Sequence, residues 1–218
     1  MRKILLIALL VIAVQIVQAQ DGHKVQIRGG LGFAGYGSKY EQTYSFGGIN
    51  FSDSNTDGAA TFHFPLEVRV ELNRRFNVGL DMKFGSYLYD PDSADGKSNR
   101  FVVVGLAGEY NFVVKEKLRW YGGVGFNGCS LVLEETKTEN GIKITNQSTY
   151  SGPGFRMNTG VLIFLIKGFG LNFNLGYDSH NFTLRKFEQN GQDVSLDNFD
   201  ATLKVSGVDG TLGLFVRF

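Results

Sequence analysis

Apolar and polar residues alternate with a period of two along most of the chain. The segment 62–73 shows this best, because apolar side chains occupy its even positions. These residues are Phe62, Phe64, Leu66, Val68, Val70 and Leu72. Successive side chains of an extended strand point to opposite faces, so the alternation predicts a strand with one apolar face.

Eight such segments follow one another after residue 20, and no helical period persists between them. They are residues 24–37, 60–73, 76–89, 100–113, 118–133, 154–166, 169–183 and 200–218. The joints alternate between short turns and long loops, the loops being residues 38–59, 90–99, 134–153 and 184–199. Short turns at one end and long loops at the other are typical of up-and-down barrels. The sequence therefore predicts an all-β fold, an eight-stranded antiparallel up-and-down β-barrel.

The two faces of the predicted strands differ in composition. One face is almost unbroken Phe, Leu and Val, whereas the other mixes glycines with charged and amide side chains. A soluble, lipocalin-like barrel would then lack an apolar core and expose an apolar exterior. We therefore predict a transmembrane barrel with a polar, side-chain-filled interior. The inward charged residues expected to pair there are Arg28, Glu67, Arg69, Glu71, Asp81, Lys83, Glu109, Arg119, Arg156 and Asp178. The alternative for this network is a gated ion or proton path.

The N-terminus has the pattern of an export signal. Arg2 and Lys3 precede an apolar run that is too short for a membrane-spanning helix, and the small residue Ala19 ends the segment. We expect residues 1–19 to be a signal peptide and residues 20–218 to be the mature barrel domain. Cleavage would leave 20 basic against 21 acidic residues, a balance that gives no reason to expect a nucleic-acid partner.

The composition supports a β-rich envelope protein. The chain has 29 glycines but only 3 prolines, and 13% of its residues are aromatic. Glycine and aromatic residues without proline suggest closely approaching strands edged by rings. The single cysteine, Cys129, cannot form an internal disulfide, and we interpret it as a small residue packed in a strand.

The last strand carries a resemblance to a known family. Its outward residues are Leu212, Leu214, Val216 and the terminal Phe218. This pattern resembles the C-terminal recognition strand of outer-membrane barrels, and the whole mature chain resembles the OmpA/OmpX/OmpW-type small barrels and their Bacteroidetes-type relatives. The resemblance implies an outer-membrane location, insertion by the barrel assembly machinery, and contact with outer-membrane lipid and lipopolysaccharide. We expect a monomer.

The first long loop contains half of a calcium-binding motif. Asp53, Asn55 and Asp57 alternate before a glycine, as the first ligands of a calcium loop do. The twelfth position, where a bidentate Glu belongs, is Phe64. Calcium binding by this loop is one interpretation, and ordinary polar turn chemistry is the other. No other cofactor is expected.

Three functions are compatible with these features. We favour a non-enzymatic barrel with a structural or surface-interaction role through its long loops. The second hypothesis is a conduit for small apolar solutes, as the resemblance to OmpW-type barrels implies. The third is a lipid A-modifying enzyme or a secretion-system component. Against an enzyme, Ser179 and His180 are adjacent and so point to opposite faces of their strand.

Overall fold

The computed structural model describes residues 24–46, 49–89, 99–139, 142–197 and 199–218. The predicted signal peptide, residues 1–19, lies outside the described residues. No helix among the described residues is long and apolar enough to cross a membrane.

The described residues form nine β-strands. They are β1 (Lys24–Phe46), β2 (Ile49–Glu71), β3 (Phe76–Tyr89), β4 (Asn99–Val114), β5 (Leu118–Glu139), β6 (Ile142–Ile166), β7 (Phe169–Gln189), β8 (Gln192–Val194) and β9 (Phe199–Arg217). All eight predicted strands are present, and the predicted segment 76–89 has the bounds of β3.

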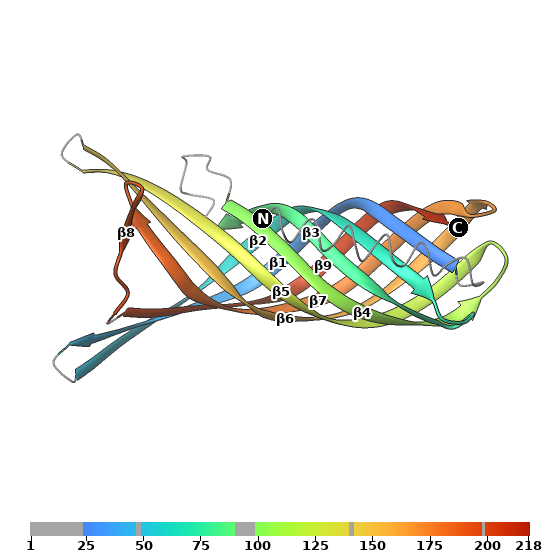
Figure 1. Ribbon diagram of the computed structural model, residues 1–218, viewed down its shortest axis with the longest axis horizontal. Coiled ribbons are helices and arrows are strands. Elements are labelled where there is room, and N and C mark those ends of the chain that lie inside the picture. Colours follow the sequence, from blue (N-terminus) through green and yellow to red (C-terminus); the bar gives the residue numbers. More distant parts are fainter. Residues whose placement is uncertain (1–23, 47–48, 90–98, 140–141, 198) are drawn as a thin grey trace.

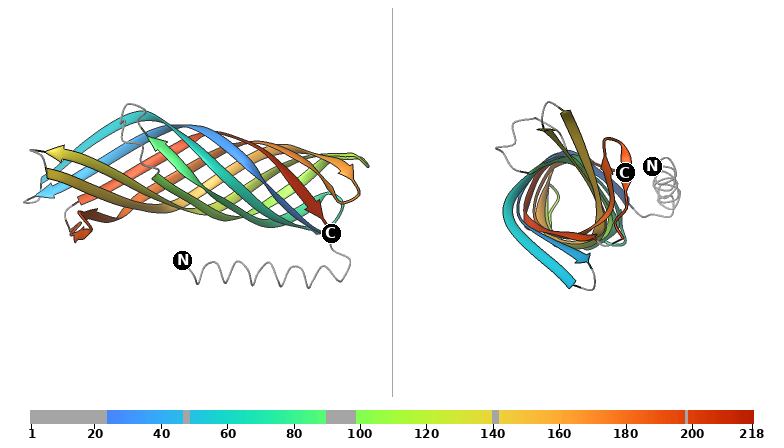
Figure 2. Two further views of the ribbon diagram at one scale, coloured as in Figure 1. Left: turned by 90° about the horizontal axis from the view of Figure 1, so that it is seen from above. Right: turned by 90° about the vertical axis from the view of Figure 1, so that its left-hand side faces the viewer.

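Eight of these strands close an antiparallel barrel. Each strand pairs with the next from β1 to β7, then β7 pairs with β9 and β9 pairs with β1. The additional strand, β8, has three residues and pairs only with β7. Figure 1 shows the long tilted strands, and the end-on view in Figure 2 shows the closed ring. The prediction of an eight-stranded up-and-down barrel is confirmed, with β8 as a small addition.

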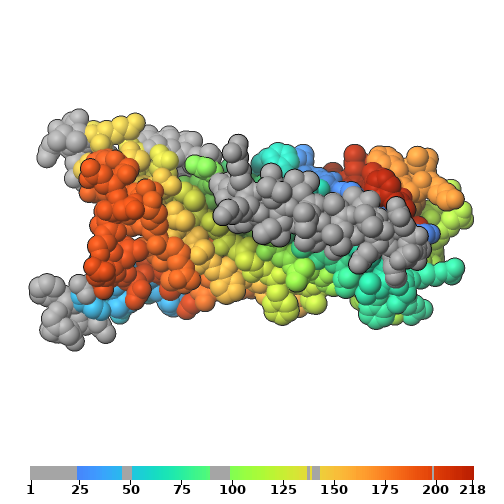
Figure 3. Space-filling model, viewed as in Figure 1, coloured from blue at the N-terminus to red at the C-terminus, as the bar shows by residue number. Residues whose placement is uncertain are grey.

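The two ends of the barrel differ, although not through long loops. One end has short turns between β2 and β3, β4 and β5, and β6 and β7. At the other end the predicted loops 38–59 and 134–153 are wrong, because β1 pairs with β2 as far as Phe46 and Ile49, and β5 pairs with β6 as far as Glu139 and Ile142. We call this the hairpin end. In Figure 3 the β7–β8 segment lies there between the two long hairpins.

The predicted loop 184–199 is also largely β-structure. β7 continues to Gln189, and a tight turn at Asn190 and Gly191 leads back into β8. Both turn residues have positive φ, 51° and 79°. This conformation suits the right-handed twist of a two-residue hairpin and explains the Asn-Gly pair. Of the predicted loop 90–99, residues 90–98 lie outside the described ranges.

Two groups of aromatic side chains bound an apolar outer band. Near the short turns the rings of Phe76, Tyr110, Phe112 and Trp120 lie in sequence, with centroids 5.0–5.3 Å apart. Further up, Phe33 lies 4.9 Å from Phe62, and Phe126 lies 5.2 Å from Phe155. Between them the outward side chains are apolar and exposed; Leu106, for example, is 68% exposed. Such a band between aromatic girdles faces lipid in transmembrane barrels.

The interior changes character at the upper group of rings. Below it, in what we call the turn half, the interior is charged and polar as predicted. Above it, in the hairpin half, an apolar core fills the barrel. This core consists of Ala34, Tyr36, Tyr87, Phe101, Val103, Cys129, Leu131, Tyr150, Phe182, Leu184, Ala201, Leu203 and Val205. The predicted polar interior therefore describes the turn half only. In the hairpin half the two faces exchange, so the outer face is polar and the inner face is apolar.

Candidate functional site

The interior of the turn half is the densest concentration of chemistry in the described residues. All ten charged residues predicted for the interior lie there, and none is more than 7% exposed. They belong to strands all around the barrel, because strict alternation turns every second side chain inward. The structure brings them together in three connected clusters.

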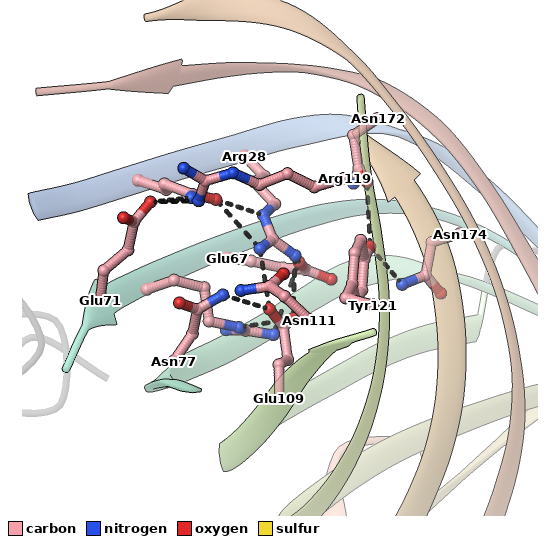
Figure 4. Close-up of polar contacts among 12 residues, drawn as sticks. Arg28, Glu67, Glu71, Asn77, Glu109, Asn111, Arg119, Tyr121, Asn172 and Asn174 are labelled. Atoms are coloured by element: carbon pink, nitrogen blue, oxygen red, sulfur yellow. Dashed lines mark hydrogen bonds and ion pairs between the residues drawn. The ribbon is translucent and has the colours of Figure 1, made fainter. Parts of the chain in front are cut away.

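The central cluster surrounds Glu109 of β4. Both terminal nitrogens of Arg28 donate to its two carboxylate oxygens at 2.8 Å, and Arg69 Nε donates to Oε1 at 2.8 Å. Asn77 Nδ2 donates to Oε2 at 3.3 Å. Figure 4 shows Arg28 and Asn77 converging on this carboxylate from β1 and β3. A paired, forked contact of this kind offsets the desolvation of both charges.

A second cluster lies above it, around two aspartates. Lys83 Nζ lies 2.5 Å from Asp178 Oδ2 and 3.2 Å from Asp209 Oδ2. His63 Nε2 lies 2.9 Å from Asp209 Oδ2. Arg156 Nη2 lies 3.3 Å from Asp209 Oδ1, while its Nη1 reaches Glu67 Oε1 at 3.7 Å and Asp81 Oδ2 at 3.9 Å. Arg156 therefore links this cluster to the carboxylates around Arg69.

A third cluster closes the barrel at the short-turn end around Glu71. Arg217 Nε and Nη2 each lie 2.6 Å from its carboxylate oxygens, and Arg119 Nη1 donates to Oε1 at 2.8 Å. Gln26 also donates to Oε1. Beside it the guanidinium of Arg119 lies over the ring of Phe164, at 5.4 Å from the centroid. The short-turn mouth is thereby filled by side chains.

Several interior residues were missing from the predicted network. Asp209, which is fully buried, contacts Lys83, His63 and Arg156. Tyr121 donates to Asn172 Oδ1 at 2.9 Å and lies under the guanidinium of Arg28. The signal for Asp209 was available, since it stands at an odd position of a strand whose even positions face outward. Its partners were not, because they come from other strands.

A thiol and an imidazole meet just above the charged clusters. Cys129 Sγ lies 2.9 Å from His180 Nδ1 and 3.0 Å from Asn127 Oδ1. Cys129 is 5% exposed and His180 is 2% exposed, and rings of Tyr36, Phe101 and Phe182 surround the imidazole. A substrate could reach this pair only by displacing the apolar core. Ser179 lies on the outward face, away from His180, as predicted.

The predicted calcium residues lie in a strand instead of a loop. Asp53, Asn55 and Asp57 belong to β2 and pair with β1 residues in regular register. Each side chain accepts a hydrogen bond from the next backbone N–H, at 2.7–2.9 Å. An extended strand spaces alternate residues by about 7 Å, so their oxygens do not converge on one ion. No group of three metal-binding side chains occurs among the described residues. The geometry gives calcium binding no support.

The C-terminal residues complete the barrel wall. Leu212, Leu214 and Val216 face outward in β9, which pairs with β1 on one side and β7 on the other. The backbone N–H of Phe218 donates to Val25 O at 2.9 Å, and its side chain is 71% exposed. The last strand thus closes the ring. Its reading by the barrel assembly machinery stays a prediction.

Comparison with known proteins adds family and fold. A family model described as "Outer membrane protein beta-barrel domain" matches residues 4–206. The outer membrane protein OprG from Pseudomonas aeruginosa aligns with a TM-score of 0.54 and 14% identity, over 89% of this chain and 95% of that one. Neisserial surface protein A aligns with a TM-score of 0.43 and 15% identity, over 86% and 96%. A comparison with curated proteins finds no significant match.

Proposed function

The chain belongs to the family of outer membrane protein β-barrel domains, and from this premise we propose that it is a sealed, non-enzymatic barrel that holds a rigid β-structure above the membrane for surface interaction. It is an outer-membrane protein. In the proposed orientation the short turns face the periplasm and the hairpins face outward, as is usual for barrels of this kind. The proposal is carried by one observation, the filling of the interior along its whole length.

The filling has two parts that block passage in different ways. In the turn half, Arg28, Arg69 and Glu109 are within 3% of complete burial and hold one another in place. In the hairpin half, apolar side chains such as Leu131 and Phe182 are fully buried. An eight-stranded barrel has an interior only just wide enough for its side chains. Among the described residues, these side chains leave no open route for an ion or an apolar solute.

The length of the strands supports a role outside the membrane. β1 has 23 residues. At about 3.4 Å per residue and a tilt of about 40°, such a strand rises about 60 Å along the barrel axis. The lipid-facing band of an outer-membrane barrel is about 25 Å tall. More than half of the rise of β1 therefore lies beyond that band, and its polar outer face suits water.

Conductance across planar lipid bilayers tests the sealed interior. We expect no steady current from the reconstituted protein, whereas a porin reconstituted in the same way conducts. Steady channels of uniform size would contradict the proposal and would favour a conduit.

Photo-crosslinking in intact envelopes tests the surface role. A photoreactive residue at Lys204, which is outward in the hairpin half, should give protein adducts. The same probe at Leu106, which is outward in the turn half, should give lipid adducts only. If the position of Lys204 gives no protein or surface-polymer adduct, the interaction role is wrong.

A further inference from the structure

The outer wall of the barrel contains a hollow of about 640 Å³ within the lipid-facing band. It extends across β5, β6, β7, β9 and β1. Its edge toward the periplasm is a row of large side chains that strand pairing places side by side. The row is Trp120, Val161, Phe173, Leu212 and Leu31. The hollow is therefore a groove across five strands of the apolar outer wall.

Small residues in the next row create the groove. Thr159 and Gly210 stand there, with Leu175 between them in the register and Phe33 beyond. A Cβ placed on Gly210 would have Phe33 O as its nearest neighbour, at 3.9 Å. Neither packing nor a positive φ therefore requires glycine at this position. The fold would accept a larger side chain at Gly210 that fills the groove, yet the residue present is glycine and the groove is open.

The groove suits an apolar, elongated occupant. Trp120 Nε1 donates to Thr159 Oγ1 at 2.8 Å, and Thr159 Oγ1 donates to Tyr121 O at 2.9 Å. The polar atoms of these two side chains are thus already satisfied. Five strands about 4.8 Å apart make a groove about 19 Å long. One leaflet of hydrocarbon is about 15 Å thick, half of the roughly 30 Å core. Because the strands are tilted, the groove climbs obliquely along the wall, and a lipid acyl chain that follows the wall fits its length.

Two lysines lie at the periplasmic end of the same face. Lys117 stands three residues before Trp120, in the turn between β4 and β5. Phe164 N donates to Lys117 O at 2.9 Å, which places this turn beside the end of β6. Lys167 follows three residues after Phe164, and both lysine side chains are exposed. Ammonium groups at this level meet the phosphates of the periplasmic leaflet.

From the groove and the two lysines together, we propose that this face binds one phospholipid of the periplasmic leaflet. One acyl chain lies in the groove beside Gly210, and the headgroup phosphate lies between Lys117 and Lys167. A second copy of the chain fits less well. Two barrels meeting symmetrically through this face would bring their lysine-bearing turns together, and like charges oppose such contact.

Native mass spectrometry on protein from phosphatidylethanolamine–phosphatidylglycerol vesicles tests the proposal. Mild detergent extraction should leave one phospholipid on the native barrel. Gly210→Leu should reduce that retention by about tenfold or more, which corresponds to about 1.4 kcal/mol. The control is Gly108→Leu in β4, on the opposite side of the ring, where an added Cβ meets nothing within 4 Å and is therefore accepted as readily as at Gly210. It should retain the lipid.

Further variants separate the contribution of the groove from that of the two lysines. Replacing Lys117 and Lys167 by Gln should weaken retention, whereas Arg74→Gln, in another short turn, should not. If Gly210→Leu does not fold, as heat-modifiable gel mobility would show, Gly210→Ala should still give an intermediate loss. Equal retention in the Gly210 and Gly108 variants would overturn the proposal. So would a dimer that depends on Gly210, or retention of lipopolysaccharide in place of phospholipid when both are offered.

Discussion

The two halves of this barrel are built by the same strands with opposite polarity. In the turn half, Leu106 and Phe126 face outward and Arg28 and Glu109 face inward. In the hairpin half, Lys204 and Asn181 face outward and Leu203 and Phe182 face inward. The alternation of successive side chains runs from one half into the other on each strand, and it is interrupted only by bulges near the strand ends. What changes is the medium outside, since lipid accepts apolar groups and water accepts polar ones.

This difference teaches that the two halves are held together by different forces. Lipid removes the hydrophobic drive to fill an interior, so the turn half is stabilised by mutually satisfying charges and hydrogen bonds. The hairpin half is surrounded by water and buries apolar side chains, as a soluble barrel does. Changes that suit one half should therefore damage the other, and the predictions below use this contrast.

The largest effect is expected from breaking the central cluster. Glu109→Leu removes the carboxylate that the buried guanidinium groups of Arg28 and Arg69 share. Removing one partner of a buried pair costs about 3–5 kcal/mol. Urea unfolding in lipid vesicles, followed by Trp120 fluorescence, measures the loss. Glu116→Leu, in an exposed short turn, is the control and should change little. Equal losses in both variants would show that the charges do not hold the turn half.

A cavity in the apolar core should cost somewhat less. Leu131 is fully buried in the hairpin half, and Leu131→Ala should lower the free energy of unfolding by about 2–5 kcal/mol. The matched change on the polar outer face, Asn181→Ala, should stay within about 0.5 kcal/mol. The same urea titration measures both. A free energy of unfolding that Leu131→Ala leaves unchanged would mean that this half is loosely packed and lacks the close-packed apolar core of a soluble protein.

The polarity change itself can be tested along one outer face. Val124 and Ser130 both face outward in β5, six residues apart. Val124→Arg lies between the aromatic girdles and should cost about 2–4 kcal/mol near the midplane. Ser130→Arg lies above the upper rings and should be almost neutral. Similar losses of stability in the two variants would mean that Val124 and Ser130 face the same medium, and would contradict the change from lipid to water between them.

Much of this architecture could be read from the sequence, but only for the turn half. The outward rows were predictable because Phe62, Phe64 and Leu66 alternate with polar residues. The hairpin half keeps the alternation but exchanges the two faces. Tyr36, Phe101 and Leu203 therefore stand at inward positions, which are polar in the turn half. The two-residue signal Asn190-Gly191 marks a hairpin in a segment that the sequence analysis assigns to a loop.

The pairing of interior charges could not be predicted in the same way. Alternation places Lys83 and Asp209 inside the barrel. It does not place them 3.2 Å apart, because they are separated by 126 residues and belong to β3 and β9. Such contacts depend on the closure of the ring and on the stagger of its strands. The sequence therefore predicts which side chains enter the interior, and only the closed barrel defines their partners.

The smallest effect concerns an exposed ion pair on the outer face of the hairpin half. Lys39 and Lys204 lie 2.7 Å and 3.0 Å from Glu41 and lower the pKa of its carboxyl from 4.5 to about 2. A lowered pKa contributes stability that is complete above pH 4.5 and is lost as the pH falls towards 2. NMR titration of the Glu41 carboxyl should give this midpoint, and Lys204→Gln should raise it. Because these groups face water, salt should weaken the shift. A midpoint that Lys204→Gln leaves unchanged would contradict the contact between β1 and β9 at this level.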